Sequence, residues 1–99
     1  MASYYARSSP VHRAVLLRSR GSCEGCGEEA PFKNRQGAPY LEPHHTIRVA
    51  DKGRDSLDSV IALCPTCHRR VHCGLDGEAY NERLIAILKK LEKRSAAGK

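Results

Sequence analysis

The sequence predicts a small α+β domain in which helices flank a β-hairpin and four cysteines hold a structural zinc ion. Two C-x-x-C pairs stand on either side of two short segments with strand character, and apolar stripes at helical spacing lie near both ends. The chain has 99 residues, so we expect one domain over residues 1–99. With no Trp and one Phe the hydrophobic core is small, and a bound metal ion would add stability to such a domain.

The first predicted helix begins at Ser9 and Pro10, as the N-cap and the first helical residue. Apolar residues at helical spacing follow, and Gly21 ends the helix. Residues 21–39 are rich in Gly, Pro, Glu and Lys and predict a loop, which contains the first cysteine pair.

The predicted hairpin consists of residues 40–49, YLEPHHTIRV, and residues 59–64, SVIALC. Pro43 inside the first strand indicates an edge position or a bulge, because proline cannot donate to the ladder. Residues 50–58, ADKGRDSLD, are turn material.

Two helices are predicted after the hairpin. Pro65 begins the first of them, TCHRRVHC follows, and the helix ends near Gly74. Asp76 caps the last helix, about residues 77–94, whose leucine and isoleucine residues form one apolar stripe.

Charge and hydropathy narrow the class of partner. The net charge is +6, with 17 Lys and Arg against 11 Asp and Glu, which suits a polyanion such as nucleic acid. No apolar run is long enough to cross a bilayer, and the N-terminal residues lack the apolar core of a signal peptide. We therefore expect a cytoplasmic location and no membrane partner, and in that reducing compartment five cysteines do not indicate a disulfide framework.

The two cysteine pairs predict a closed metal site. Cys23 with Cys26, and Cys64 with Cys67, supply the four thiolates that a tetrahedral structural zinc needs, and the spacer between them is long enough to contain the hairpin. The alternative is two unrelated redox motifs or buried thiols. Cys73 is interpreted as a small buried apolar residue.

The histidines predict a second, open metal site. His68 and His72 stand four residues apart, on one face of a helix, and can share an ion. His44 and His45 are neighbours on a strand and point to opposite faces, so one joins the helical pair while the other acts as a general base. The spacing leaves open which does which, and an alternative makes His68 the fourth ligand of a mixed zinc site. His12 is interpreted as a surface residue.

The segment LEPHHTIRVADKGRDSLDSVIALCPTCHRRVH, with CEGCG upstream, resembles the HNH endonucleases, the ββα-metal nucleases. It is similar to their cysteine-containing branch, which includes modified-cytosine-dependent restriction enzymes of the McrA type. The resemblance covers about residues 11–73. Within it the two C-x-x-C pairs (zinc knuckles), the HH strand and C-H-x-x-x-H occur in the family's order. It implies a ββα-metal (HNH) fold and a metal-dependent DNA endonuclease.

The resemblance also assigns roles. It implies that His44 binds the catalytic divalent ion (Mg²⁺, Mn²⁺, Ni²⁺, Co²⁺ or Zn²⁺), that His45 is the general base, and that the family's middle Asn falls on Ser59, which has a shorter reach. The remaining implied metal ligands are His68 and His72 for the catalytic ion, and Cys23, Cys26, Cys64 and Cys67 for the structural zinc.

The expected activity is phosphodiester hydrolysis to 5′-phosphate and 3′-hydroxyl ends, in the nuclease domain of a modification-dependent restriction enzyme. The partner is DNA, and a homodimer and a fusion to a separate DNA-reading domain both stay open. The candidate DNA-binding residues are Arg48, Arg54, Arg69 and Arg70. The alternative function is a zinc-stapled DNA-binding module without catalysis, which binds one metal ion per chain instead of two.

Overall fold

The computed structural model describes residues 10–47 and 57–97 of the chain. The elements in chain order are α2 (Pro10–Ser19), β1 (Glu42–His45), β2 (Val60–Leu63), α3 (Pro65–Cys73) and α4 (Gly77–Ala97). The predicted α+β class, with a hairpin and flanking helices, is confirmed. Most of the predicted turn over residues 50–58 lies outside the described residues. Within the described part, no helix has the length and apolar character that a membrane span requires.

The two strands form an antiparallel ribbon that is shorter than the sequence predicts. Glu42 pairs with Leu63 at one end, and His45 pairs with Val60 at the other. Beyond β1 the chain bends. Along this segment the polar residues His44 and Thr46 are buried, while the apolar Ile47 is 45% exposed. The strand therefore turns an imidazole, instead of an aliphatic side chain, toward the interior.

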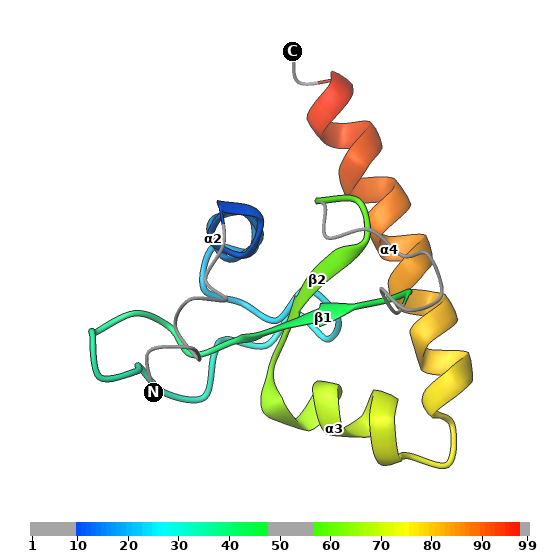
Figure 1. Ribbon diagram of the computed structural model, residues 1–99, viewed down its shortest axis with the longest axis horizontal. Helices are drawn as coiled ribbons and strands as arrows, with labels where there is room; N and C mark the ends of the chain where they lie inside the picture. Colours follow the sequence, from blue (N-terminus) through cyan, green and yellow to red (C-terminus); the bar gives the residue numbers. More distant parts are fainter. Residues whose placement is uncertain (1–9, 48–56, 98–99) are drawn as a thin grey trace.

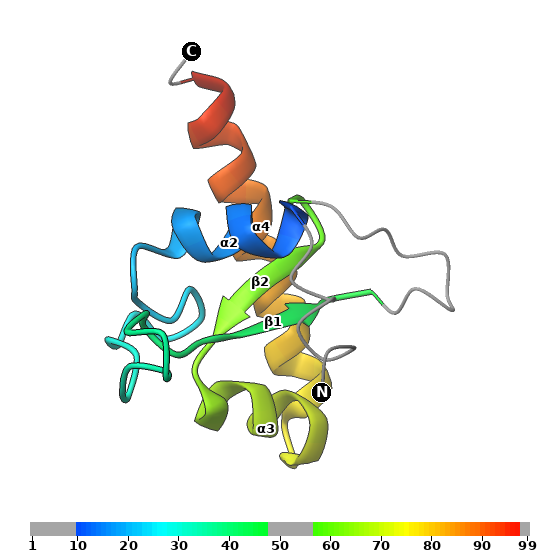
Figure 2. The same cartoon turned by 60° about the vertical axis from the view of Figure 1, so that its left-hand side comes forward.

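The core lies on both sides of β2, which passes between α2 and α4 (Figure 1). All four residues of β2 are fully buried. Val15 from α2, and Leu84 and Leu88 from α4, are buried with them. Burying a valine, leucine or isoleucine side chain of this kind contributes about 1.5–3 kcal/mol. This packing holds β2, and β1 pairs with it. Helix α3 follows β2 and lies beside the hairpin and the start of α4 (Figure 2).

The long loop after α2 brings the first cysteine pair to the hairpin. The helix ends where Arg20 and Gly21 take positive φ angles of 56° and 83°. Glu24 then pairs with the free edge of β2, since its N–H donates to the Ala62 carbonyl at 2.8 Å and its Oε1 accepts from the Ala62 N–H at 3.0 Å. The Arg18 guanidinium donates twice to the same carboxylate, at 2.7 and 2.8 Å. The knuckle loop is thus held against the sheet.

Candidate metal centres and active site

The four paired cysteines meet between the knuckle loop and the start of α3. Their sulfur atoms lie within 4.8 Å of one another, and Cys26 Sγ lies 4.0 Å from Cys64 Sγ. Zn–S bonds of about 2.3 Å in tetrahedral geometry place ligand sulfurs about 3.8 Å apart. All four are free thiols. The donor set and its spacing therefore fit a structural zinc ion.

Backbone N–H groups are already aimed at two of these sulfurs. Cys23 Sγ accepts from the amides of Gly25 and Cys26 at 3.3 and 3.4 Å, and Cys64 Sγ accepts from the Cys67 amide at 3.4 Å. Burial raises the pKa of Cys23, but the backbone donors outweigh burial and lower that pKa to about 7. Burial raises the pKa of Cys67 well above its usual value. Because this shift favours the protonated thiol of Cys67, four thiolates at this spacing would require a bound cation to balance their charge.

Glycine at position 25 permits the close approach of the knuckle to the core. A Cβ atom at this position would lie 2.7 Å from the Tyr80 hydroxyl oxygen and 3.0 Å from Leu63 Cδ2. The Tyr80 hydroxyl donates to Cys67 Sγ at 3.1 Å. The loop, α3 and α4 are thus joined at one sulfur cluster.

A second cluster is formed by three histidines, one from β1 and two from α3. The potential ligand nitrogens of His44, His68 and His72 lie within 4.8 Å of one another. The two helical Nε2 atoms are 3.2 Å apart. Nitrogens that share a zinc ion in tetrahedral geometry, at about 2.0–2.1 Å, are separated by roughly 3.3–3.4 Å. Three imidazoles at this spacing fit one divalent ion with positions left open.

A carboxylate fixes the orientation of the first helical imidazole. His68 Nδ1 lies 2.7 Å from Glu42 Oε1, and the Tyr40 hydroxyl donates to Glu42 Oε2 at 2.7 Å. Burial raises the pKa of Glu42, but the hydrogen bonds from Tyr40 and His68 outweigh burial and lower it. The carboxylate accepts the Nδ1 proton, so the Nε2 lone pair of His68 is left for a ligand, as is common at metal-binding histidines.

His44 is the buried member of the cluster, at 5% exposure. Burial lowers its pKa, which favours the neutral imidazole that can bind a metal ion. Its ring lies edge-on to those of His68 and His72, with centroids at 5.2 and 5.1 Å.

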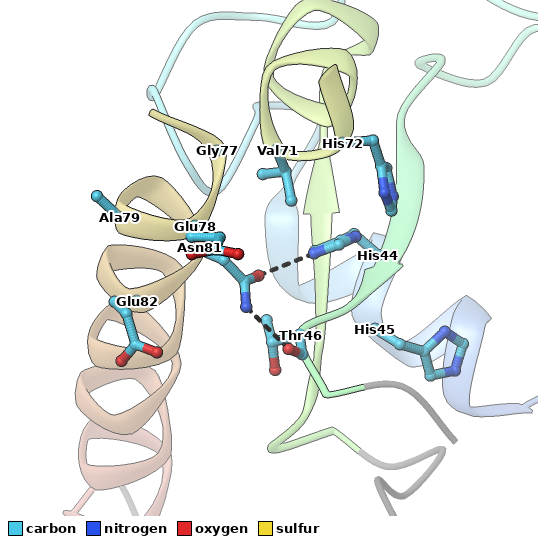
Figure 3. A pocket seen from close by; sticks show the side chains of 10 residues that line it. All are labelled: His44, His45, Thr46, Val71, His72, Gly77, Glu78, Ala79, Asn81 and Glu82. Carbon is cyan, nitrogen blue, oxygen red and sulfur yellow. Dashed lines mark hydrogen bonds between the residues drawn. The ribbon is translucent and has the colours of Figure 1, made fainter. Parts of the chain in front are cut away.

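His45 projects from β1 to the side opposite His44, yet both residues line one pocket (Figure 3). The His45 ring packs edge-on against His12 at a centroid distance of 5.7 Å. The interpretation of His12 as a surface residue is therefore wrong, because α2 docks its half-buried ring beside β1. The pocket is lined by His44, His45, Thr46, Val71, His72, Gly77, Glu78, Ala79, Asn81 and Glu82.

Ser59 holds the end of β1 through its backbone. Its carbonyl accepts from the Thr46 N–H and from the Thr46 hydroxyl, both at 2.9 Å. Ser59 is buried at 7% exposure and directly precedes β2, opposite the end of β1. Thr46, the residue after His45, is thus tied to Ser59.

The candidate DNA-binding arginines differ in their surroundings. Arg69 is exposed, whereas the Arg70 guanidinium forms two hydrogen bonds with the Asp76 carboxylate and lies 4.1 Å above the Tyr80 ring centroid. Arg48 and Arg54 lie outside the described residues.

The structure differs from the sequence-based interpretation at three further residues. Cys73 is exposed at the end of α3, so its interpretation as a buried residue is wrong. Sequence reasoning also missed Glu42 and Asn81 as partners of the histidines. Strand alternation could have found Glu42, two residues before His44. No local signal could have found Asn81, because its position depends on how α4 docks.

Comparison with known proteins decides the family. The family model described as HNH endonuclease matches residues 23–74, more than half of the chain. The chain belongs to the HNH endonuclease family. The predicted membership, including the McrA-like branch, is confirmed by two relatives. Over 89 residues the chain is 40% identical to the type IV methyl-directed restriction enzyme EcoKMcrA of Escherichia coli K12. This match covers 90% of the chain and 32% of that enzyme.

A solved structure supports the same assignment. The structure of the type IV phosphorothioation-dependent restriction endonuclease ScoMcrA superposes with a TM-score of 0.77 at 29% identity. The match covers 85% of this HNH chain but only 16% of the ScoMcrA chain. The chain therefore spans about a third of the curated relative and a smaller share of the solved one.

Proposed function

We propose that this HNH domain is a metal-dependent DNA endonuclease that hydrolyses phosphodiester bonds to 5′-phosphate and 3′-hydroxyl ends. The observation that carries the proposal is the three-histidine cluster, two of whose members, His44 and His72, line a pocket that also has His45 on its wall. Catalytic metal sites keep open positions for water and substrate, whereas structural sites are closed.

His44, His68 and His72 hold the divalent ion, and the cysteine cluster holds structural zinc. When bound, the divalent ion supplies positive charge for the phosphoryl oxygens and the leaving alkoxide. Mg²⁺, Mn²⁺, Ni²⁺, Co²⁺ and Zn²⁺ are all candidates for the three-histidine site.

His45 takes the proton from the attacking water. Its ring lies beside the pocket and points away from His44 and His72, which supports a role separate from metal binding (Figure 3). Ser59 supports it indirectly, by holding Thr46. Histidine is the side chain that most often serves as a general base in enzymes.

DNA is held by the basic surface, with exposed Arg69 as the described candidate and Arg48 and Arg54 as further candidates. Because Arg70 is already engaged by Asp76, we assign it a smaller share of phosphate contact. The relatives are much longer than this chain, which supports a fusion in which a separate module recognises modified DNA.

The test is cleavage of a supercoiled plasmid with each divalent ion in turn, beside the His45→Ala variant. Losing a general base costs about 10²–10⁴-fold in rate. We expect His45→Ala to lose cleavage while it still binds metal and DNA, and EDTA to stop the parent. The control is Lys89→Ala, a change on the exposed face of α4. Equal cleavage by His45→Ala and the parent would remove the base assignment.

The product ends have their own measurement. Nicks with a 5′-phosphate and a 3′-hydroxyl are resealed by DNA ligase without prior treatment, so resealing supports the proposed polarity of cleavage.

Ser59 at the family's Asn position favours the second candidate, a DNA-binding module without catalysis. That candidate predicts one metal ion per chain after mild chelation and reloading, whereas the nuclease binds two.

A further inference from the structure

Asn81 connects α4 to the strand that carries two of the histidines. It lies beyond residues 23–74, the part of the chain that the family model matches. Its Nδ2 atom donates to the Thr46 carbonyl at 2.9 Å, and its Oδ1 atom lies 3.0 Å from His44 Nε2 (Figure 3). The two contacts fall on the residues that immediately precede and follow His45.

The chemistry of these partners fixes the direction of every hydrogen bond. A backbone carbonyl can only accept, so the NH₂ group of Asn81 must face Thr46. The amide oxygen then faces His44 and can only accept as well. His44 Nε2 must therefore carry a proton, and in the neutral ring the lone pair resides on Nδ1.

This arrangement matches the one at His68, approached from another element. Glu42 accepts from His68 Nδ1 and leaves Nε2 for a ligand, whereas Asn81 accepts from His44 Nε2 and leaves Nδ1. The second nitrogen of the His44 ring lies on the side that faces His72 (Figure 3). The lone pairs of both rings are thus directed to the same cluster.

We propose that Asn81 is a positioning residue for this nuclease site: it holds His44 in the Nε2–H tautomer and anchors the end of β1 on both sides of His45. Thr46 is then held through its carbonyl by Asn81 and through its N–H and hydroxyl by Ser59. The proposal rests on the proposed function in one respect, that His44 is a metal ligand.

The tautomer can be measured without metal or DNA. Long-range ¹H–¹⁵N correlation spectra, recorded on protein with zinc at the cysteines and nothing at the histidines, report which nitrogen of His44 carries the proton. We expect Nε2–H in the parent and a large Nδ1–H fraction in Asn81→Leu, which removes the acceptor while keeping a good helix former. Lys89→Ala is the control on the same helix and should match the parent.

Metal affinity gives the second readout. Losing a partner that orients a ligating histidine costs typically about 10–100-fold in metal affinity. We expect Asn81→Leu to lose Mn²⁺ affinity to this extent, as measured by electron paramagnetic resonance. Mn²⁺ is chosen because a hard ion leaves zinc in place at the thiolates. An unchanged tautomer together with Mn²⁺ affinity within twofold of the parent would overturn the proposal.

Asn81→Asp separates the two contacts and decides the matter if the Leu variant does not fold. Its carboxylate still accepts from His44 but faces the Thr46 carbonyl with an oxygen instead of an N–H. We expect Nε2 to keep its proton and Mn²⁺ to bind at least as well as in the parent, while plasmid cleavage falls. An Nε2 that loses its proton in this variant overturns the proposal. If the parent binds none of the five candidate ions at the histidines and cleaves no plasmid, while Asn81→Leu still shifts the tautomer, the proposed function fails and the positioning role stands.

Discussion

The four-cysteine cluster and the three-histidine cluster use neighbouring turns of the same helix but are built differently. Cys23 and Cys67 are nearly inaccessible, and backbone amides donate to the sulfurs. At the histidines only His44 is buried, His72 is exposed, and the partners are the side chains of other elements. Amides fixed by the fold suit a closed site that stabilises, whereas side-chain partners suit an open site whose ligands must be oriented for a reaction.

Helix α3 makes the second cluster depend on the first. Cys64 is its N-cap, and Cys67 stands directly before His68. A zinc ion at the cysteines would fix where the helix begins, and it would thereby set the position of His68 beside Glu42. Damage to the sulfur cluster should therefore reach the histidines, while damage at the histidines should leave the sulfur cluster intact.

The largest expected effect is that of Cys64→Ala. Structural zinc contributes about 10–16 kcal/mol of apparent binding energy in small peptides, and a domain of this kind has only about 5–15 kcal/mol of net stability. We expect loss of zinc, of the cooperative thermal transition and of metal binding at the histidines. Zinc content and circular dichroism measure it. A soluble, fully active Cys64→Ala protein would contradict the structural role.

Glu42→Ala should act on the histidine cluster alone. His68 then loses the acceptor of its Nδ1 proton, and we expect metal affinity to fall by about 10–100-fold with zinc still bound at the cysteines. Glu42→Gln keeps an acceptor oxygen and should lose less. Calorimetric titration of the zinc-loaded protein gives the affinity, with Glu29→Ala, an exposed loop position, as the control. A simultaneous loss of zinc would mean that the two clusters are not separable in this direction.

Tyr80→Phe should have the smallest effect, and on the sulfur side. It removes the hydroxyl that donates to Cys67 Sγ but keeps the ring beneath Arg70. A hydrogen bond of this kind contributes about 0.5–1.5 kcal/mol, and 1 kcal/mol lowers the melting temperature by roughly 4–8 °C in a domain this small. Zinc stoichiometry and cleavage should be unchanged. An unaltered melting temperature would show that the phenol does not stabilise this cluster.

The elements themselves could be predicted because their signals are local. Pro10, Gly21 and Pro65 mark helix boundaries by backbone sterics, and the structure begins or ends helices at or next to them. Strand lengths were less accurate. A run of strand-forming residues continues past His45, but pairing with β2 ends at Val60, and only pairing defines a strand.

The sequence by itself determined which groups are candidates for the chemistry: the order and spacing of the cysteines and histidines predict two clusters of different donor type and indicate the HNH family. Only the tertiary structure decided how those groups are oriented. The alternation of β1 and the turn of α3 place His44, His68 and His72 near one another, but Asn81 reaches His44 from α4, a helix far away in the sequence. Such a contact depends on how separate elements pack together, so no local pattern encodes it.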